Sequence, residues 1–382
     1  MADMYLDHAA TTPLHPAVLE AMLPYWQSVY GNASSLHRFG RKARQAVTGA
    51  RDGIADALGC SPGELVFTGG GTESDNMAIF GVAEALRPAG KRHVVTTAIE
   101  HHAVLHACDA LERRGYEVTR VPVDRSGVVA ADAIAAALRA DTALVSVMYV
   151  NNETGAIQPI EAIGRLCANR GVTFHVDAVQ ALGVLPIELG ALPVDLMSFS
   201  AHKINGPKGT GLLYVKHGIK LQPLHYGGVQ ETGRRPGTEN VAGIVGLAAA
   251  VALAQAEIAN KQQSMLRLRQ LFQEAVVQAV GEGGALFHGD ADRCAPHIVC
   301  VSFPGVERDI MLMNLDLAGI AVSAGSACTA GALEPSHVLA AMGLSDELLR
   351  SAIRASFGYG SGETEIVQAA QIMGTIAQRI RM

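Results

Sequence analysis

The chain has 382 residues, of which 49% are hydrophobic and 17% are charged, and its formal net charge is −6. This apolar content excludes an intrinsically disordered protein. The length exceeds the roughly 250–300 residues at which a single core stops growing, so we expect two domains. The negative balance and the lack of a basic stripe argue against nucleic-acid binding as the main role.

The first residues contain no basic, apolar leader, and we expect no signal peptide. The longest apolar run, 241–254, is shorter than the ~18–20 residues that a membrane span needs, so we expect no membrane partner. Six cysteines are scattered along the chain without a C-x-x-C pair, which indicates free thiols in a reducing compartment and no structural zinc. A cytoplasmic location follows as an expectation.

Strand and helix patterns alternate from about residue 15 to residue 255. Short, valine-rich runs that predict buried strands lie at 65–67, 93–97, 118–121, 143–150, 172–177, 195–200 and 211–215. Helical patterns lie between them at 75–86, 103–114, 132–138 and 160–169. This alternation predicts an α/β fold whose mostly parallel sheet is covered by helices on both faces.

The pattern changes after Asn240. Residues 241–280 indicate one or two long helices, and they are followed by a strand near 298–303 and a C-terminal helix from Glu363. We therefore predict a large domain at 16–255. We predict a smaller α+β domain built from residues 1–15 and 256–382.

A glycine-rich motif, TGGGTESDN at 68–76, follows a predicted strand and opens a helix. Its glycines permit close backbone approach, and the free N–H groups of a helix start can bind an anion. No Gly-Lys-Ser/Thr follows, so the motif is not a P-loop. Taken alone, it fits a glycine turn with a helix cap equally well.

Two later strands end in polar residues. One ends at Asp177, where ligands bind in open α/β sheets; an acid there could hold a positively charged nitrogen or simply cap the next helix. The other runs through Ser200 into His202 and Lys203 among small residues. A lysine in such a pocket can form an imine, although most lysines are solvated. An anion cradle, an acid and a lysine together meet the needs of pyridoxal phosphate.

With these motifs in place, the chain resembles the cysteine desulfurases of the NifS/IscS type, within the aspartate aminotransferase superfamily. The matching motifs are YLDHAATTP at 5–13, GNASSLH at 31–37, NNETG at 151–155, GTEN at 237–240, GSACT at 325–329 and EPSHVL at 334–339. The resemblance covers nearly the whole chain. It implies the fold of the pyridoxal-phosphate-dependent transferases.

The resemblance also implies the cofactor contacts. Lys203 would carry pyridoxal phosphate as a Schiff base, Asp177 would face the pyridinium nitrogen, and Gln180 would hydrogen-bond the phenolic oxygen. His101 would stack on the ring. The further cofactor-binding residues would be Gly71, Thr72, Ser200, His202 and, from the second subunit of a homodimer, Thr238.

Asn152 and Arg354 would hold the substrate, because a guanidinium fork suits the α-carboxylate of L-cysteine. Lys203 would remove the Cα proton. Cys328, set among small residues, would take the sulfur as a persulfide while L-alanine leaves, with His101 as a candidate base. The adjacent His101 and His102 do not suggest a metal site, since sequence neighbours rarely converge on one ion.

Two departures from the family pattern stand out. Pro236 replaces a serine found in many relatives, and the chain stops at Met382, where housekeeping members carry a tail that helps to dock an iron–sulfur scaffold. The sulfur acceptor is therefore left open between such a scaffold and a specialised, nitrogenase-type role. Aminotransferase, selenocysteine lyase and a non-enzymatic sulfur relay remain alternatives. Cys328 favours the desulfurase over an aminotransferase, and the intact Lys203, Asp177 and Arg354 favour an enzyme over a relay.

Overall fold

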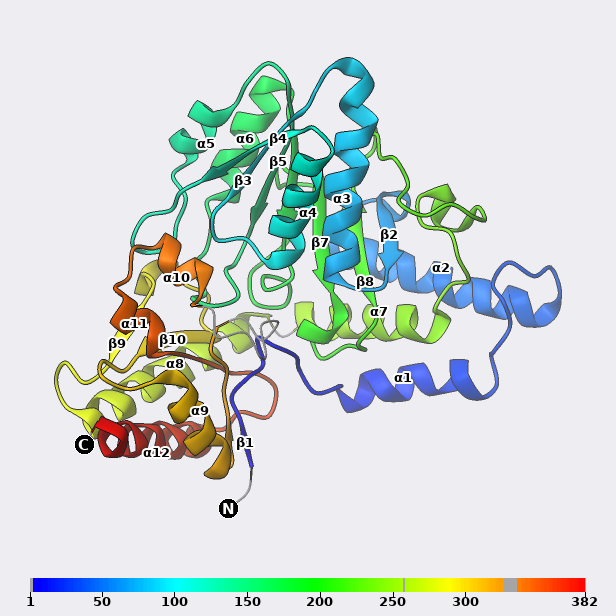
Figure 1. The fold of residues 1–382 in the computed structure, drawn as a ribbon. Coiled ribbons are helices and arrows are strands. Elements are labelled where there is room, and N and C mark those ends of the chain that lie inside the picture. The colour runs from blue at the N-terminus through cyan, green and yellow to red at the C-terminus, as the bar shows by residue number, and fades with distance from the viewer. Residues whose placement is uncertain (1–2, 257, 326–334, 382) are drawn as a thin grey trace.

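The computed structural model describes residues 3–256, 258–325 and 335–381. At its centre is a seven-stranded sheet with the strand order β2-β8-β7-β6-β5-β3-β4 (Figure 1). The strands are β2 (Leu65–Thr68), β3 (His93–Thr97), β4 (Glu117–Val121), β5 (Thr142–Met148), β6 (Thr173–Asp177), β7 (Leu196–Ser200) and β8 (Gly211–Val215). Strand β8 runs in the opposite direction to the other six strands, so the predicted α/β class with a mostly parallel sheet is confirmed.

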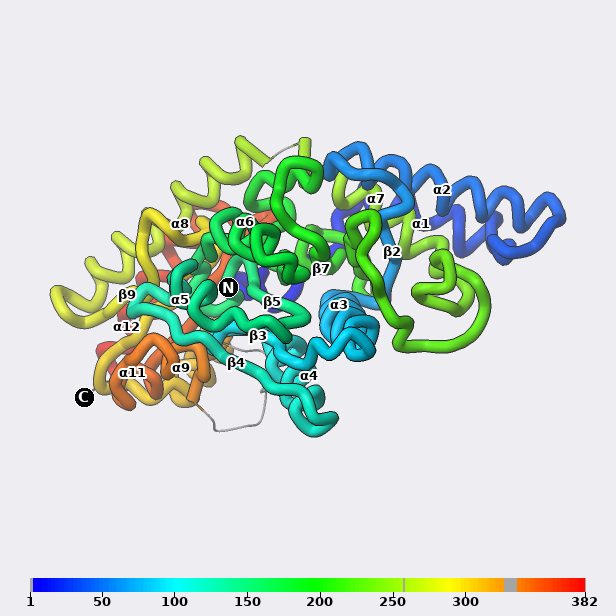
Figure 2. Tube along the Cα trace, turned by 90° about the horizontal axis from the view of Figure 1, so that it is seen from above, coloured from blue at the N-terminus to red at the C-terminus, as the bar shows by residue number. Residues whose placement is uncertain are grey.

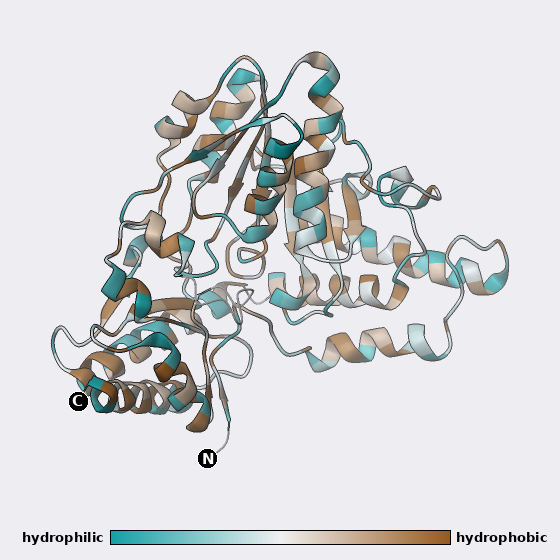
Figure 3. Cartoon of the chain, in the orientation of Figure 1, coloured by the Kyte–Doolittle hydropathy of each residue, from teal (hydrophilic) through white to brown (hydrophobic). Residues whose placement is uncertain are grey.

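Helices cover both faces of this sheet, as its doubly buried strands require. On β5, Val145 packs into a core with residues of α2 (Arg38–Leu58), α6 (Ile160–Arg170) and α7 (Val241–Ala256). Its neighbour Leu144 points to the opposite face, where α3 (Gly71–Leu86) and α4 (His102–Arg113) pack. Figure 3 shows the resulting concentration of hydrophobic residues along the central strands.

The start of α3 differs from the sequence prediction. The helix begins at Gly71 instead of residue 75, because Gly70 has φ 153°, a backbone conformation that side-chain-bearing residues avoid. The glycine turn is thus the helix N-terminus itself. Strand β5 also ends earlier than predicted, at Met148, before the turn formed by Asn151 and its neighbours.

Two N-terminal helices were not assigned from the sequence. Helix α1 (Pro16–Gln27) and helix α2 pack against α7 and project away from the sheet (Figures 1 and 2). Short α5 (Ala131–Ala137) packs beside α6.

The C-terminal part forms a separate core with its own three-stranded antiparallel sheet, β12-β10-β9. Its elements are α8 (Ile258–Val280), β9 (Leu286–His288), β10 (Ile298–Ser302), α9 (Arg308–Leu317), β11 (Ile320–Ala321), α10 (His337–Ala341), α11 (Asp346–Arg350), β12 (Ala352–Ser356) and α12 (Glu363–Arg381). Strand β1 (Met4–Tyr5) pairs in parallel with β11, so the N-terminus joins this part. We propose that this core, with β1, is the smaller domain.

Within the described ranges, no single helix combines the length and apolar character needed to cross a membrane. Helices α7 and α8 would reach that length and composition only as a pair, across a bend of 72°.

Candidate active site

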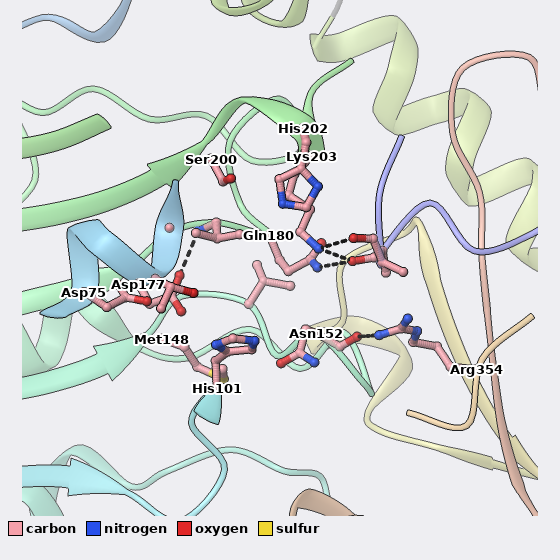
Figure 4. Close-up of a pocket in the computed structure, with 16 residues that line it drawn as sticks. Asp75, His101, Met148, Asn152, Asp177, Gln180, Ser200, His202, Lys203 and Arg354 are labelled. Carbon is pink, nitrogen blue, oxygen red and sulfur yellow. Dashed lines mark hydrogen bonds between the residues drawn. The ribbon is translucent and has the colours of Figure 1, made fainter. Parts of the chain in front are cut away.

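A pocket of about 200 Å³ lies at the carboxyl end of the parallel strands, between the two cores (Figure 4). It brings together most of the predicted site residues. They are Gly71, Thr72, His101, Asn152, Asp177, Gln180, Ser200, His202, Lys203 and Arg354. The convergence of residues this far apart in the sequence makes the pocket the candidate active site.

Lys203 lies in a short 3-10 turn (Ala201–Lys203) immediately after β7. Its Nζ donates hydrogen bonds to the backbone carbonyls of Ala9, at 2.5 Å, and Ala10, at 2.8 Å. The N-terminal motif therefore aims the amine into the pocket. The sequence identified both segments but gave no sign that they touch.

Asp177 is the last residue of β6, and its Oδ1 accepts a hydrogen bond from the backbone N–H of Val179 at 2.9 Å. Burial raises the pKa of this carboxyl, while the nearby Lys203 lowers it. Gln180 follows on the same loop and donates from Nε2 to the Ala9 carbonyl at 2.8 Å. A buried carboxyl in this position would be stabilised as an anion by a positively charged ring nitrogen.

The first turn of α3, next to the loop that follows β6, can serve as an anion cradle in the pocket wall. Gly71 and Thr72 lie at the free N–H groups of this 16-residue helix, facing Ser200 and His202. A Cβ on Gly71 would lie 2.7 Å from Val179 Cγ2, so a larger residue there would require Val179 to shift. Burial, followed by the charge of Lys203, lowers the pKa of His202 to about 4, which makes its ring a neutral partner at neutral pH.

This arrangement fits pyridoxal phosphate in each of its parts. The cradle suits a phosphate, Asp177 suits a protonated pyridine nitrogen, and Lys203 suits an aldehyde carbon. His101 completes the wall as the N-cap of α4, where its Nδ1 accepts from the Ala103 N–H at 3.1 Å. Burial and Lys203 lower the pKa of His101 to about 4, so the neutral ring can lie against an aromatic cofactor.

Arg354 reaches the pocket from β12, which belongs to the other core. It is 1% exposed, and it donates from Nη1 to the Asn152 carbonyl at 2.7 Å and from Nη2 to Asp7 Oδ1 at 2.8 Å. A guanidinium held in this way is prepared to bind a carboxylate. Substrate binding at this point would involve both cores.

One predicted site residue in the described ranges, Thr238, is exposed and does not line the pocket. Another, Cys328, lies outside the described residues. Asp75 also lines the pocket, although the sequence predicted it only as part of the glycine-rich motif and the start of a helix. Its position four residues after Gly71 on α3 was the available signal. In the described ranges, no three histidine, cysteine or acidic side chains are grouped to hold a metal.

The family model of the class-V aminotransferases matches residues 4–368. The chain therefore belongs to this family, whose cofactor is pyridoxal phosphate.

Within that family it groups with the cysteine desulfurases of the IscS type. It is 48% identical to a protein of Bacillus subtilis named putative cysteine desulfurase IscS 1, over the full length of both chains. It is 44% identical to a cysteine desulfurase IscS of Dictyoglomus turgidum, over 99% of this chain and 95% of that one. A solved structure of a NifS-like protein superposes with a TM-score of 0.92 at 37% identity, covering 99% of this chain and 100% of the other. A structure described as SspA in complex with cysteine superposes with a TM-score of 0.80 at 36% identity, covering 93% and 98%.

Proposed function

We propose that this enzyme converts L-cysteine to L-alanine and transfers the sulfur first to its own Cys328 and then to an acceptor. The observation that carries the proposal is the placement of Lys203, Asp177 and Arg354 around one pocket. These three groups can respectively remove a proton, stabilise a cationic ring and hold an α-carboxylate. The full-length similarity to cysteine desulfurases supports the choice of L-cysteine.

We propose the following roles for the residues that line the pocket. Bound pyridoxal phosphate supplies the electron sink for the pair released at the substrate Cα. Arg354 and Asn152 hold the substrate carboxylate, which fixes Cα within reach of Lys203. Lys203 Nζ takes the Cα proton, and Asp177 keeps the proton on the ring nitrogen.

Sulfur transfer needs a thiolate from the protein. Cys328 bonds to the substrate sulfur as the Cβ–S bond breaks, which leaves Cys328 as a persulfide and the carbon skeleton as L-alanine. No external oxidant is required, because the carbon skeleton is reduced while the sulfur is oxidised. Neutral His101 is a candidate acceptor for the thiol proton.

The sulfur acceptor is proposed to be a protein such as an iron–sulfur scaffold.

The described cysteines are all free thiols, namely Cys60, Cys108, Cys167, Cys294 and Cys300. They support a reducing compartment, and we propose the cytoplasm.

Replacing Cys328 by alanine should leave the cofactor bound and abolish release of sulfide and alanine from L-cysteine. The substitution removes the sulfur acceptor but no proposed cofactor contact. The measurement is the visible absorbance of parent and variant, followed by assays of both products with a reductant present. Cys300→Ala, at a buried thiol, is the matched control. A Cys328→Ala variant that retains full activity would shift the assignment to another pyridoxal-phosphate reaction, such as transamination.

We further propose that the active unit is a homodimer in which Thr238 contacts the phosphate of the neighbouring subunit. Thr238 is exposed in its own chain, and Tyr226 and Val229 of the same loop are 80% and 87% exposed. Apolar side chains that are exposed in a single chain are typical of a surface that a partner subunit covers.

Mixing two inactive variants tests this shared site. Thr238→Glu should lose the cofactor through charge repulsion, and Lys203→Ala should lose the catalytic amine. Refolded together, they form mixed dimers with one intact site, so up to half of the parental activity per mixed dimer should return. Sedimentation as a monomer, or a mixture that stays inactive, would refute the shared site.

A further inference from the structure

A second carboxyl group lies beside Asp177 in the floor of the pocket. Asp75, the fifth residue of α3, is 1% exposed and lines the pocket next to Asp177 (Figure 4). Its Oδ1 has no hydrogen-bond partner among the described residues. The proposed mechanism gives this group no role.

The basic group in ion-pair range of Asp75, within the part described, is the ring of His175, whose Nε2 lies 3.6 Å from Asp75 Oδ1. Both nitrogens of this ring already have hydroxyl partners. Nδ1 is 2.9 Å from Ser146 Oγ and Nε2 is 2.9 Å from Ser198 Oγ. Burial lowers the pKa of His175 to about 3, so the ring is neutral and supplies no charge to balance a carboxylate.

The surroundings of Asp75 and Asp177 differ in a way that decides which of them is ionised. Asp177 accepts a backbone N–H and faces the charge of Lys203. Asp75 lies near the Ser198 hydroxyl and the neutral ring of His175, neither of which carries a positive charge. Two acids, Asp177 and buried Glu100, are also nearby. Two adjacent buried carboxyls cannot both ionise without a large cost. Burial and the charge of Asp177 accordingly raise the pKa of Asp75 well above its usual value, against a smaller lowering by the Ser198 hydroxyl. Burial also raises the pKa of Glu100 to about 8.

We infer that Asp75 is a positioning residue that carries a proton beside the cofactor, so that the negative charge of the pair stays on Asp177. The Ser198 hydroxyl lies near Asp75, and the Ser198–His175–Ser146 chain fixes that hydroxyl. Asp177 then meets the ring nitrogen as a full anion. This inference rests on the proposed cofactor site and not on the identity of the substrate.

Infrared difference spectroscopy of the holoenzyme tests the protonation state directly. At neutral pH, the carbonyl stretch of a protonated carboxylic acid should be present in the parent and diminished in Asp75→Asn. Glu100→Gln, the matched control, should remove its own band and leave that of Asp75. An unchanged band in Asp75→Asn overturns the inference, because Asp75 would then be ionised and His175 its cationic partner. Aspartate-selective carboxyl ¹³C NMR of the parent gives the same answer without a variant.

A double-mutant cycle tests the coupling to Asp177. In Asp177→Asn the remaining acid, Asp75, can take up the charge and partly replace the lost anion. The loss of cofactor affinity caused by Asp75→Asn should therefore be at least about tenfold larger in the Asp177→Asn background than in the parent, as expected for residues in contact. Equal losses in both backgrounds would show that the two carboxyls do not share a charge. Because the readout is the Kd of pyridoxal phosphate, the result is independent of desulfurase activity.

Discussion

Replacing Lys203 by alanine should reduce turnover of L-cysteine by about 10²–10⁴-fold, the range expected for loss of a positioned acid–base group. The amine is held by the carbonyls of Ala9 and Ala10 at the pocket wall, and the described pocket offers no other lysine. Formation of L-alanine measures the rate, and the visible spectrum reports how the cofactor is bound.

Two further variants distinguish the positive charge of Lys203 from its role as a proton acceptor. Lys203→Arg keeps a cation in the pocket but supplies no amine of suitable basicity, so it should be as inactive as the alanine variant. Lys216→Ala, at the end of β8 and 3.8 Å from Asp195, should retain activity because it lies away from the pocket. An active Lys203→Arg enzyme would mean that the lysine contributes only its charge.

Replacing Arg354 by glutamine should raise the KM for L-cysteine by about 10- to 100-fold, since a hydrogen bond to a charged group contributes about 1.5–3 kcal/mol. It should also lower the free energy of unfolding, by less than the about 3–5 kcal/mol expected for a fully buried ion pair, because the Asp7 side chain left behind is 17% exposed. Arg354 is 1% exposed and paired with Asp7, so both effects have the same structural source. Steady-state kinetics and urea unfolding measure the two separately.

Asp7→Asn is the matched control for this prediction. It breaks the ion pair but leaves the guanidinium in place, so stability should fall while KM changes less than in Arg354→Gln. If both variants raise KM equally, Arg354 acts by bracing the pocket wall and does not bind the substrate carboxylate itself.

The sheet was predictable because its signals are local. The strands at 93–97 and 211–215 were placed to the residue, since each is a short apolar run bounded by polar or glycine residues. The parallel alignment of β3 with β4 and β5 follows from the intervening helices, whereas the reversed direction of β8 was not predicted. The start of α3 was missed because the glycines suggested a loop, whereas the structure uses Gly70 to turn directly into the helix.

Site residues could be predicted from the sequence where the residue type and its place at a strand end indicate its chemistry. They could not be predicted where their role depends on contacts between distant parts of the chain. Lys203 and Asp177 stand at strand ends, where ligands bind. Nothing in the sequence indicates that the Ala9 carbonyl meets Lys203 across 194 positions. Likewise, Asp75 is identified as a pocket residue only once α3 is seen to present it beside β6.

Residues 7–10 form hydrogen bonds to two of the proposed site residues. Asp7 holds the guanidinium of Arg354, and two to three residues later Ala9 and Ala10 hold the amine of Lys203. One short peptide therefore sets the spacing between the group proposed to grip the substrate and the group proposed to deprotonate it. Deleting this N-terminal segment would remove the hydrogen bonds to both Arg354 and Lys203. The distance between the two side chains would then no longer be fixed by one peptide.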